Sequence, residues 1–527
     1  MARPFRRPPP GYSNTMTPVW KIENTAPARL RVTPGQRHDV VVIGGGLTGL
    51  VTALLLAQNG VEVAVVEARR IGDGTTGAST AKVSLLQGIR AQRIRHRHSA
   101  EVLRAYLDAN HAGQQWLLEY CGRRGVAWQP ADACTYAQSE RELTFVRREF
   151  GALREAEMPV EFTDRIDAPF PALGAVRLAR QAQLNPMSLL ASLAAEVESH
   201  TAPIYESSLV HGVHTAAAGD HLIETEHGPI LAGTVVLATG TPILDRSGFF
   251  TRLLPLRSYL TAYLLPQPIS TGMYITAGEP TRSIRTVPDP DGDVLLVGGN
   301  GHVVGRGDHT DELVADLRDW TERWYPSATP LTTWSAQDYQ PIGELPYAGS
   351  LLPGHDKILL ATGYAKWGFT NAVAAAQVVA GQIMGKRPDW ADVFATWRPD
   401  ELRSLPAAVR ITTGVALEFC AGWWHLARTA PDALPPAEGV GRVERRLGRP
   451  AATCTVDGTT TTVSAICPHL AGILRWNPAE KSWDCPLHGS RFAADGTRLE
   501  GPATDHLTPL STPVTRPPAH IPEPDER

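Results

Sequence analysis

Residues 39–49 read DVVVIGGGLTG, and they indicate the fold class of most of the chain. A continuous apolar run ends in three glycines with the spacing G-x-G-x-x-G. Gly44 allows a tight turn, Gly46 lets the backbone approach a pyrophosphate, and Gly49 lets the next helix pack closely on the strand. The helix expected over residues 50–59 would direct its N-terminal amides at that phosphate. Strand, glycine turn and helix together predict a dinucleotide-binding unit in an α/β domain.

A second strand and a carboxylate complete this unit. Gly60 ends the helix, residues 61–66 read VEVAVV, and Glu67 follows 18 residues after Gly49. A carboxylate at this place accepts hydrogen bonds from the ribose hydroxyls of the adenosine half and repels a 2′-phosphate. A glycine triplet alone also occurs in strand–helix turns that bind nothing, but here all parts of the unit occur in order. The sequence therefore predicts a dinucleotide without a 2′-phosphate.

Three later segments favour FAD over NAD. Residues 235–240 (VVLATG) and 358–363 (ILLATG) are apolar strands that each end in Ala-Thr-Gly, and the second is followed by YAKWGFTN and a helix. Residues 72–82, GDGTTGASTAK, form a polar loop of small residues. Over about residues 35–400 the chain resembles the D-amino-acid oxidase and glycine oxidase superfamily of FAD-dependent oxidoreductases.

The resemblance implies how the cofactor is held. In that superfamily the loop equivalent to residues 72–82 wraps the flavin, although a loop of this composition is also typical of a flexible surface segment. A helix N-terminus there faces the pyrimidine side of the flavin, where negative charge develops on reduction. The residues expected to bind FAD are Gly44, Gly46, Gly49, Glu67, Thr80, Ala81, Gly240, Gly363, Trp367, Gly368 and Thr370.

A second cofactor motif stands near the end of the chain. Cys467-Pro468-His469 is separated by 15 residues from Cys485-Pro486-Leu487-His488. Two thiolates on one iron and two neutral imidazoles on the other make a Rieske 2Fe–2S centre. Zinc also accepts two cysteines and two histidines, but a C-x-H pair is tight for the common zinc-finger spacings. We therefore expect a 2Fe–2S cluster whose ligands are Cys467, His469, Cys485 and His488.

The region around this motif resembles Rieske domains but lacks features of the high-potential respiratory ones. Those carry a further cysteine in each loop, joined as a disulfide, where Ala471 and Leu487 stand here. Phe492 replaces a tyrosine whose hydroxyl lies close to the cluster, and Ser490 remains as a donor. Since fewer donors to the sulfurs lower the potential, we expect the lower half of the Rieske range of roughly −150 to +300 mV. Only 39 residues follow His488, so a Rieske dioxygenase with a downstream mononuclear iron domain is not expected.

The bulk composition restricts the function classes. The 527 residues are 43% hydrophobic and 20% charged, with a formal net charge of −4, which argues against a nucleic-acid partner. Six unevenly placed cysteines do not describe a secreted disulfide framework, and no signal peptide is recognised, so a cytoplasmic protein is expected. No run is long and apolar enough for a transmembrane anchor. The interrupted apolar stretch 411–424 is expected to be a packing helix rather than a membrane-surface helix.

Alternating strands and helices predict an α/β class, a Rossmann-like two-dinucleotide-binding FAD fold with an α+β substrate domain built on an antiparallel sheet. Residues 281–304, with a Pro-Asp-rich turn, are expected to form a hairpin of that sheet. A small all-β Rieske domain should follow. The expected boundaries are an extended leader 1–37, an FAD domain 38–400 whose substrate layer comes from roughly 130–180 and 255–335, a helix and Pro-rich linker 401–438, the Rieske domain 439–513 and a tail 514–527.

The resemblance implies that a small amine or amino-acid-like substrate reduces the FAD. Because a flavin accepts two electrons and a Rieske cluster moves one at a time, we expect the cluster to pass them singly to an acceptor protein or quinone. Two alternatives remain at this point. In one, the cluster feeds the flavin and drives a reduction or monooxygenation; in the other, the chain is a redox-sensing or scaffold protein. An arginine in the substrate layer, such as Arg257, would be able to clamp a carboxylate, although ion pairing or packing is the more common role of such residues. The candidate catalytic residues are Arg285, Tyr259, His302 and Tyr339.

Overall fold

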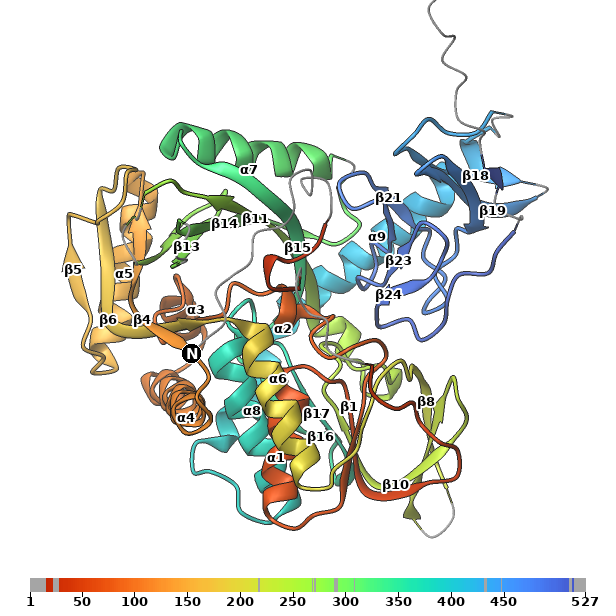
Figure 1. Ribbon diagram of the computed structural model, residues 1–527, viewed down its shortest axis with the longest axis horizontal. Coiled ribbons are helices and arrows are strands. Elements are labelled where there is room, and N and C mark those ends of the chain that lie inside the picture. The colour runs from red at the N-terminus through yellow and green to blue at the C-terminus, as the bar shows by residue number, and fades with distance from the viewer. Residues whose placement is uncertain are drawn as a thin grey trace, which may run out of the picture. The chain divides into compact units, whose positions relative to one another are not determined.

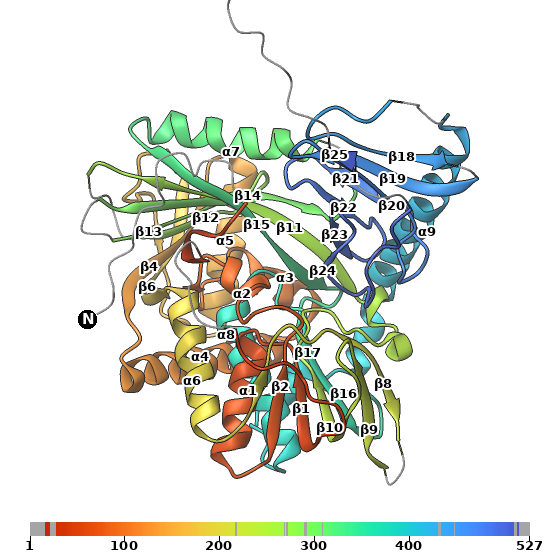
Figure 2. The same cartoon turned by 45° about the vertical axis from the view of Figure 1, so that its right-hand side comes forward.

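The computed structural model consists of two compact units, which are described separately (Figures 1 and 2). The first comprises Met1–His302 and Leu313–Ile411, and the second comprises Val303–Glu312 and Thr412–Arg527. The residues described are 16–21, 28–216, 219–267, 269, 272–288, 292–307, 309–430, 434–446, 448–510 and 514–515. The expected tail from residue 516 onward lies outside them, as do residues 1–15 of the expected leader.

A mainly parallel sheet forms the dinucleotide-binding part of the first unit. Its order is β16 (Tyr347–Leu352), β17 (His355–Thr362), β10 (Ile230–Leu237), β1 (Arg37–Ile43), β2 (Val63–Val66) and β7 (Ile204–Tyr205), with the hairpin of β8 (Val210–Thr215) and β9 (His221–Thr225) attached to β10. The pairs from β17 to β7 are parallel, and β16 is an antiparallel edge strand. Continuous valines and isoleucines form these strands because both faces of such a sheet are buried. The predicted Rossmann-like fold is confirmed.

Three helices pack together on one side of this sheet (Figure 1). They are α1 (Leu47–Gln58), α6 (Pro186–Ser199) and α8 (Gly368–Ile383), and α1 contacts both of the others. The long helix α4 (Ala100–Arg124) packs against α8 in turn. This arrangement places the start of α1 and the start of α8 next to the carboxyl ends of β1 and β17, where ligands bind in open α/β sheets.

A second sheet of nine strands forms the expected substrate layer. Its order is β15 (Thr329–Pro341), β11 (Leu253–Leu264), β14 (Val294–Val303), β13 (Arg282–Val287), β12 (Met273–Thr276), β4 (Trp128–Ala137), β6 (Gly174–Leu184) and β3 (Lys82–Val83), and β5 (Glu161–Thr163) pairs with β6. The hairpin of β13 and β14 confirms the one expected over residues 281–304, of which residues 289–291 lie outside the described residues. The parallel pairing of β12 with β4 joins the two sequence segments of the layer. Helices α3 (Arg90–Arg97), α5 (Glu140–Glu155) and α7 (Thr310–Trp324) complete this part of the chain.

Part of the expected leader is folded rather than extended. Residues Val19–Lys21 form a short 3-10 helix, and Trp20 is 5% exposed. The Trp20 indole Nε1 donates a hydrogen bond to the Ser79 carbonyl at 2.9 Å, and Lys21 pairs with Asp73 at 3.1 Å. Because a tryptophan buries a large apolar area, this segment fixes itself on the loop that was expected to wrap the cofactor.

The second unit contains the expected all-β domain. One four-stranded sheet is built from β18 (Gly441–Arg446), β19 (Arg449–Val456), β20 (Thr459–Ser464) and β25 (Val514–Thr515), and another from β21 (Arg475–Asn477), β22 (Ser482–Asp484), β23 (Arg491–Ala493) and β24 (Arg498–Glu500). Its small core includes Trp483 and Phe492, both fully buried. The fold class predicted for this region is confirmed.

Helix α9 (Leu405–Arg428) contains the apolar stretch 411–424. It packs on one side only: the Gly422 backbone lies against Ile473, and the Trp423 indole donates to the Ala471 carbonyl at 3.2 Å. Leu417 and Trp424 are 66% and 62% exposed. The expected packing helix therefore packs through one face and leaves these apolar side chains exposed. Among the helices of the described residues, none has the length and apolar character required to cross a bilayer.

Candidate functional site

The glycine turn after β1 has the geometry that a pyrophosphate requires. Gly44 has a φ of +114°, and a Cβ there would overlap the Ala238 carbonyl. A Cβ at Gly49 would overlap the Gly44 carbonyl, because α1 packs directly on the turn. A Cβ at Gly46 would find its nearest neighbour, Thr76 Oγ1, at 3.4 Å, so that side of the turn is open to a ligand. These residues fit the pyrophosphate of FAD at the N-terminus of α1.

We expect Gly49→Ala to abolish FAD retention. The added methyl group must displace the Gly44 carbonyl and with it the turn, which also lowers the free energy of unfolding by several kcal/mol as overpacking does. FAD content per chain and thermal unfolding measure both effects. The matched control is Gly122→Ala in α4, where an added Cβ meets no atom within 4 Å and the FAD content should stay at the wild-type value. A Gly49→Ala protein with a full complement of FAD would contradict the prediction.

Glu67 is held at the end of β2 in the position expected for binding the ribose. Its Oε2 accepts a hydrogen bond from Gly45 N at 2.7 Å and its Oε1 accepts one from Arg69 N at 3.0 Å. Each carboxylate oxygen keeps a lone pair for a further donor. The carboxylate is therefore oriented toward the glycine turn, where it fits the ribose hydroxyls.

The loop before α8 is tied to the start of α1. The Tyr364 hydroxyl lies 2.9 Å from Thr48 Oγ1, and Ala365 N donates to the Tyr339 carbonyl at 3.2 Å. Gly363 has a φ of +83°, a left-handed backbone conformation that favours glycine and forms this turn. Trp367 occupies the N-cap position of α8. The structure thus brings the two predicted cofactor segments together.

Two other predicted cofactor residues lie at different depths. Gly240, with a φ of +80°, follows the end of β10 by three residues and lies next to Tyr339. Thr370 is almost completely buried, and its hydroxyl donates to Asn110 Oδ1 at 2.6 Å and accepts from Gln87 Nε2 at 3.2 Å. Contact of either residue with FAD stays a prediction.

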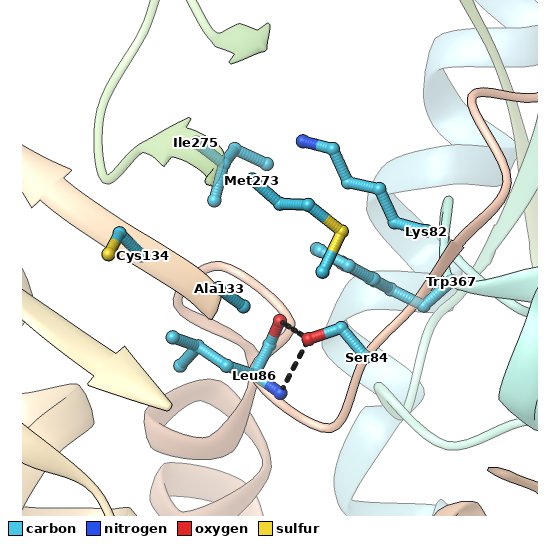
Figure 3. Close-up of a pocket in the computed structure, with 8 residues that line it drawn as sticks. All are labelled: Lys82, Ser84, Leu86, Ala133, Cys134, Met273, Ile275 and Trp367. Atoms are coloured by element: carbon cyan, nitrogen blue, oxygen red, sulfur yellow. Dashed lines mark hydrogen bonds between the residues drawn. The ribbon is translucent and has the colours of Figure 1, made fainter. Parts of the chain in front are cut away.

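A small pocket lies beside these segments (Figure 3). It has an empty volume of about 190 Å³ and draws its walls from β3, β4, β12 and the cap of α8. The lining residues are Lys82, Ser84, Leu86, Ala133, Cys134, Met273, Ile275 and Trp367. Figure 3 shows the long side chain of Lys82 on one side of the pocket and Cys134 on the other, with the Ser84 hydroxyl turned to the backbone of Leu86. The pocket is apolar except for one cation and a few small polar groups.

Lys82 is partly buried and has no acidic partner among the described residues. Its Nζ donates to the Tyr274 carbonyl at 3.0 Å and to Ser283 Oγ at 2.8 Å. Burial, with a smaller contribution from Arg285, lowers the pKa of Lys82 to about 7. A buried cation without a counterion is costly, and such groups are typical of functional sites. An anion in the pocket would remove that cost.

The structure brings together only some of the candidate catalytic residues. The rings of Tyr259 and His302 stack with centroids 5.5 Å apart. The Tyr339 hydroxyl accepts a hydrogen bond from Gln337 Nε2 at 2.9 Å, on β15. Arg285 is fully buried and donates to backbone carbonyls of Thr80, Ala81 and Leu184. The catalytic roles of these four residues stay predictions.

Of the lining residues, only Trp367 is predicted from the sequence, and Lys82 is the charged one that the sequence does not predict. In the sequence it is only the last residue of the polar loop 72–82. The available signal was its rarity: the chain has very few lysines among many arginines, and one of them falls inside the expected cofactor loop. Burial next to β12 is a long-range contact, which the sequence pattern does not encode.

Two loops of the second unit present the four expected cluster ligands. The first is closed by hydrogen bonds from Cys467 N to the Gly472 carbonyl at 2.9 Å and from Ala471 N to the Cys467 carbonyl at 3.0 Å. The second is closed by Cys485 N to the Ser490 carbonyl at 2.8 Å, with a bond from Gly489 N back to the Cys485 carbonyl at 3.2 Å. The two loops therefore have the same construction, with a cysteine at the base of each.

The ligand side chains face one another in like pairs. The thiols of Cys467 and Cys485 lie within hydrogen-bonding distance, and the rings of His469 and His488 have centroids 5.1 Å apart at 87°. Burial, with smaller contributions from His469 and Arg306, lowers the pKa of His488 to about 3, so its imidazole is neutral, as a metal ligand requires. Two thiols and two imidazoles in pairs fit the two irons of a Rieske cluster. In the described part of the chain, no group of three or more acidic, cysteine or histidine side chains surrounds a single metal position.

The structure around these loops agrees with the differences from high-potential respiratory Rieske proteins that the sequence shows. All six cysteines are free, so no disulfide joins the loops. Ser490 is fully buried within hydrogen-bonding distance of the Cys467 thiol, and its Oγ accepts a bond from Ala503 N at 2.9 Å. Phe492 lies in the core and offers no donor. The low reduction potential that these features favour stays a prediction.

Comparison with known families settles the class of protein. Residues 39–382 match the family model described as FAD dependent oxidoreductase (DAO), and residues 429–513 match the Rieske [2Fe-2S] domain. The chain belongs to the FAD dependent oxidoreductase family and carries a C-terminal Rieske domain. It is an oxidoreductase whose cofactors are FAD and a 2Fe–2S cluster.

Individual relatives share one or both parts. The putative Rieske 2Fe-2S iron-sulfur protein YhfW of Bacillus subtilis (strain 168) is 26% identical over 494 residues, covering 93% of this chain and 96% of its own. Glycine oxidase of Pseudomonas aeruginosa is 26% identical over 371 residues, covering 66% of this chain and 95% of its own. The crystal structure of glycine oxidase from Geobacillus kaustophilus has a TM-score of 0.59 at 21% identity and covers 69% of this chain and 99% of that chain, which shows a shared fold.

Proposed function

We propose that the protein oxidises a small amine or amino-acid-like substrate and that electrons pass singly between its flavin and its Rieske cluster. The observation that carries the substrate class is the pocket beside the cofactor segments, in which the partly buried Lys82 ammonium is the one cation among the lining residues. The glycine oxidase name of a relative supports the same class.

The residues of the pocket define what the protein itself contributes. Bound FAD supplies a two-electron acceptor, and a bound Rieske cluster supplies a one-electron carrier. The Lys82 ammonium would bind a substrate carboxylate and orient the molecule, while Met273, Ile275 and Leu86 would exclude water from it. The pocket is small, which favours a substrate with few heavy atoms.

Electron export completes the proposal. The partner is an acceptor protein or a quinone, because a Rieske centre releases one electron at a time. A cytoplasmic location fits the six free cysteines and stays part of the proposal.

An anaerobic screen tests the proposal. The full-length protein with both cofactors is mixed with glycine, other small amino acids, N-methylated amino acids and simple amines, and loss of flavin absorbance is followed. At least one small carboxylate-bearing amine should bleach the flavin, and an amine of equal size without a carboxylate should react far more slowly. If none bleaches it while a chemically reduced cluster transfers electrons to the flavin, the cluster feeds the flavin and the proposed direction is wrong.

The pH dependence of that reaction follows from Lys82. Only the ammonium form binds a carboxylate, so the second-order rate constant for flavin reduction should be constant below about pH 7 and fall up to tenfold per pH unit above it. The substrate carboxylate is ionised over the whole range, so its own titration does not produce the decline. Stopped-flow measurements between pH 5.5 and about 9 give the profile. A flat profile over this range would contradict the assignment of Lys82.

A further inference from the structure

The segment Val303–Glu312 belongs to the unit that carries the Rieske fold, although it lies far from that domain in sequence. It follows β14, includes the start of α7, and precedes the matched Rieske residues 429–513 by a long stretch of chain. All of its residues except residue 308 are described. A Rieske domain taken by its sequence boundaries alone lacks this segment.

The segment approaches the second ligand loop at backbone distance. Gly305 has a φ of +68°, and a Cβ there would lie 2.7 Å from Pro486 N and 2.8 Å from the Cys485 carbonyl carbon. Real Cβ atoms do not come this close to backbone, so only glycine fits without moving the loop. The contact therefore falls between the two ligands Cys485 and His488.

Arg306 and Thr310 fix the segment at both of its ends. Arg306 Nε donates to the Pro486 carbonyl at 2.9 Å. Thr310 Oγ1 donates to Asn477 Oδ1 at 2.6 Å and accepts from Ala479 N at 3.3 Å. Thr310 and Asn477 are both buried, so these bonds are protected from water. Residues outside the Rieske sequence therefore hold the loop with Cys485 and His488 in place.

Arg306 also brings a positive charge to this loop. Its side chain is half-buried, and its guanidinium lies close enough to Cys485 to interact with it electrostatically. The other charged groups that face it, Glu418 and Arg475, form an ion pair with each other at 2.6 Å and so largely neutralise one another. Reduction of a bound cluster adds one negative charge, and a fixed cation in partly buried surroundings stabilises that charge.

We propose that Arg306 is a positioning residue of the iron–sulfur centre, which holds the second ligand loop through the Pro486 carbonyl and shifts the cluster toward its reduced form. The structural role of Arg306 and the effect of its charge can be tested separately, because lysine keeps the charge and lacks the planar, fork-shaped donor of arginine.

The test uses the full chain matured with iron and sulfide. Arg306→Gln, Arg306→Lys and Gly305→Ala are compared with wild type for iron and labile sulfide content, FAD content, and the ratio of reduced to oxidised cluster at a fixed applied potential, read by electron paramagnetic resonance. The matched control is Arg445→Gln, an exposed arginine on the edge strand β18.

Arg306→Gln should lower the reduced-to-oxidised ratio roughly tenfold, as expected for loss of one nearby charge, while Arg306→Lys stays within about threefold and Arg445→Gln within about twofold of wild type. Gly305→Ala should lower the cluster content and leave the FAD content unchanged. If Arg306→Gln matures without a cluster at normal FAD content, the result supports the role of Arg306 in holding the ligand loop. The charge effect is then decided by whether Arg306→Lys keeps the wild-type ratio of reduced to oxidised cluster. Full cluster content and a wild-type ratio in Arg306→Gln would overturn the proposal.

Discussion

Replacing Lys82 by methionine should slow anaerobic reduction of the flavin by a carboxylate-bearing substrate about 100-fold or more at pH 6.5, with FAD still bound. Loss of one partner of a buried ion pair costs about 3–5 kcal/mol, which corresponds to a factor of this size. Methionine has a similar length and no charge, so the pocket remains filled. Stopped-flow absorbance gives the rate constant, and the flavin spectrum gives the FAD content.

The control for this variant is Lys357→Met, which removes an exposed lysine at the start of β17. Its rate constant should equal that of wild type. Lys82→Met should also abolish the decline of the rate constant above about pH 7, because the titrating group is gone. A Lys82→Met protein that reacts within threefold of wild type at pH 6.5 would show that the substrate is bound elsewhere.

Cys485→Ser should remove the cluster and leave the flavin reaction intact. A serine hydroxyl does not replace a thiolate as an iron ligand, and Cys485 lies at the base of the second ligand loop. Iron and labile sulfide should fall to background, and steady-state electron transfer to a one-electron acceptor should fall by about 100-fold or more. Anaerobic reduction of FAD by substrate should stay within about twofold of wild type, because that reaction uses the first unit alone.

Cys454→Ser is the matched control for the cluster ligand. Cys454 is buried in the same small core, where its thiol lies 3.4 Å from Thr461 Oγ1 and 3.5 Å from the Ala494 carbonyl, and a serine hydroxyl can form the same bonds. This variant should keep a full cluster. Equal loss of iron from both variants would mean that the unit is merely destabilised by loss of a buried thiol.

The parts of the site that the sequence predicts are those set by local backbone requirements. Gly44 and Gly49 are required because a Cβ would overlap neighbouring carbonyls, and the two Cys-Pro loops close on themselves through bonds over five residues. Such constraints leave a fixed spacing in the sequence. The glycine turn and the four cluster ligands are therefore visible without a structure.

The parts that the sequence does not predict depend on contacts between distant segments. Lys82 reaches the Tyr274 carbonyl across 192 positions, and Trp20 covers Ser79 from a segment expected to be an extended leader. Arg285, a candidate carboxylate clamp by its residue type, uses its guanidinium on backbone carbonyls of the cofactor loop. None of these contacts requires residues at a fixed spacing in the sequence.

The central claim, electron exchange between the two cofactors, is tested most directly on one sample. The full-length protein with both cofactors oxidised is mixed anaerobically with a substrate from the screen and frozen at successive times. Flavin absorbance and the electron paramagnetic resonance signal of the reduced cluster are recorded on the same material. If the two cofactors exchange electrons, the cluster signal appears as the flavin bleaches; complete bleaching with no cluster signal at any time would show that they do not.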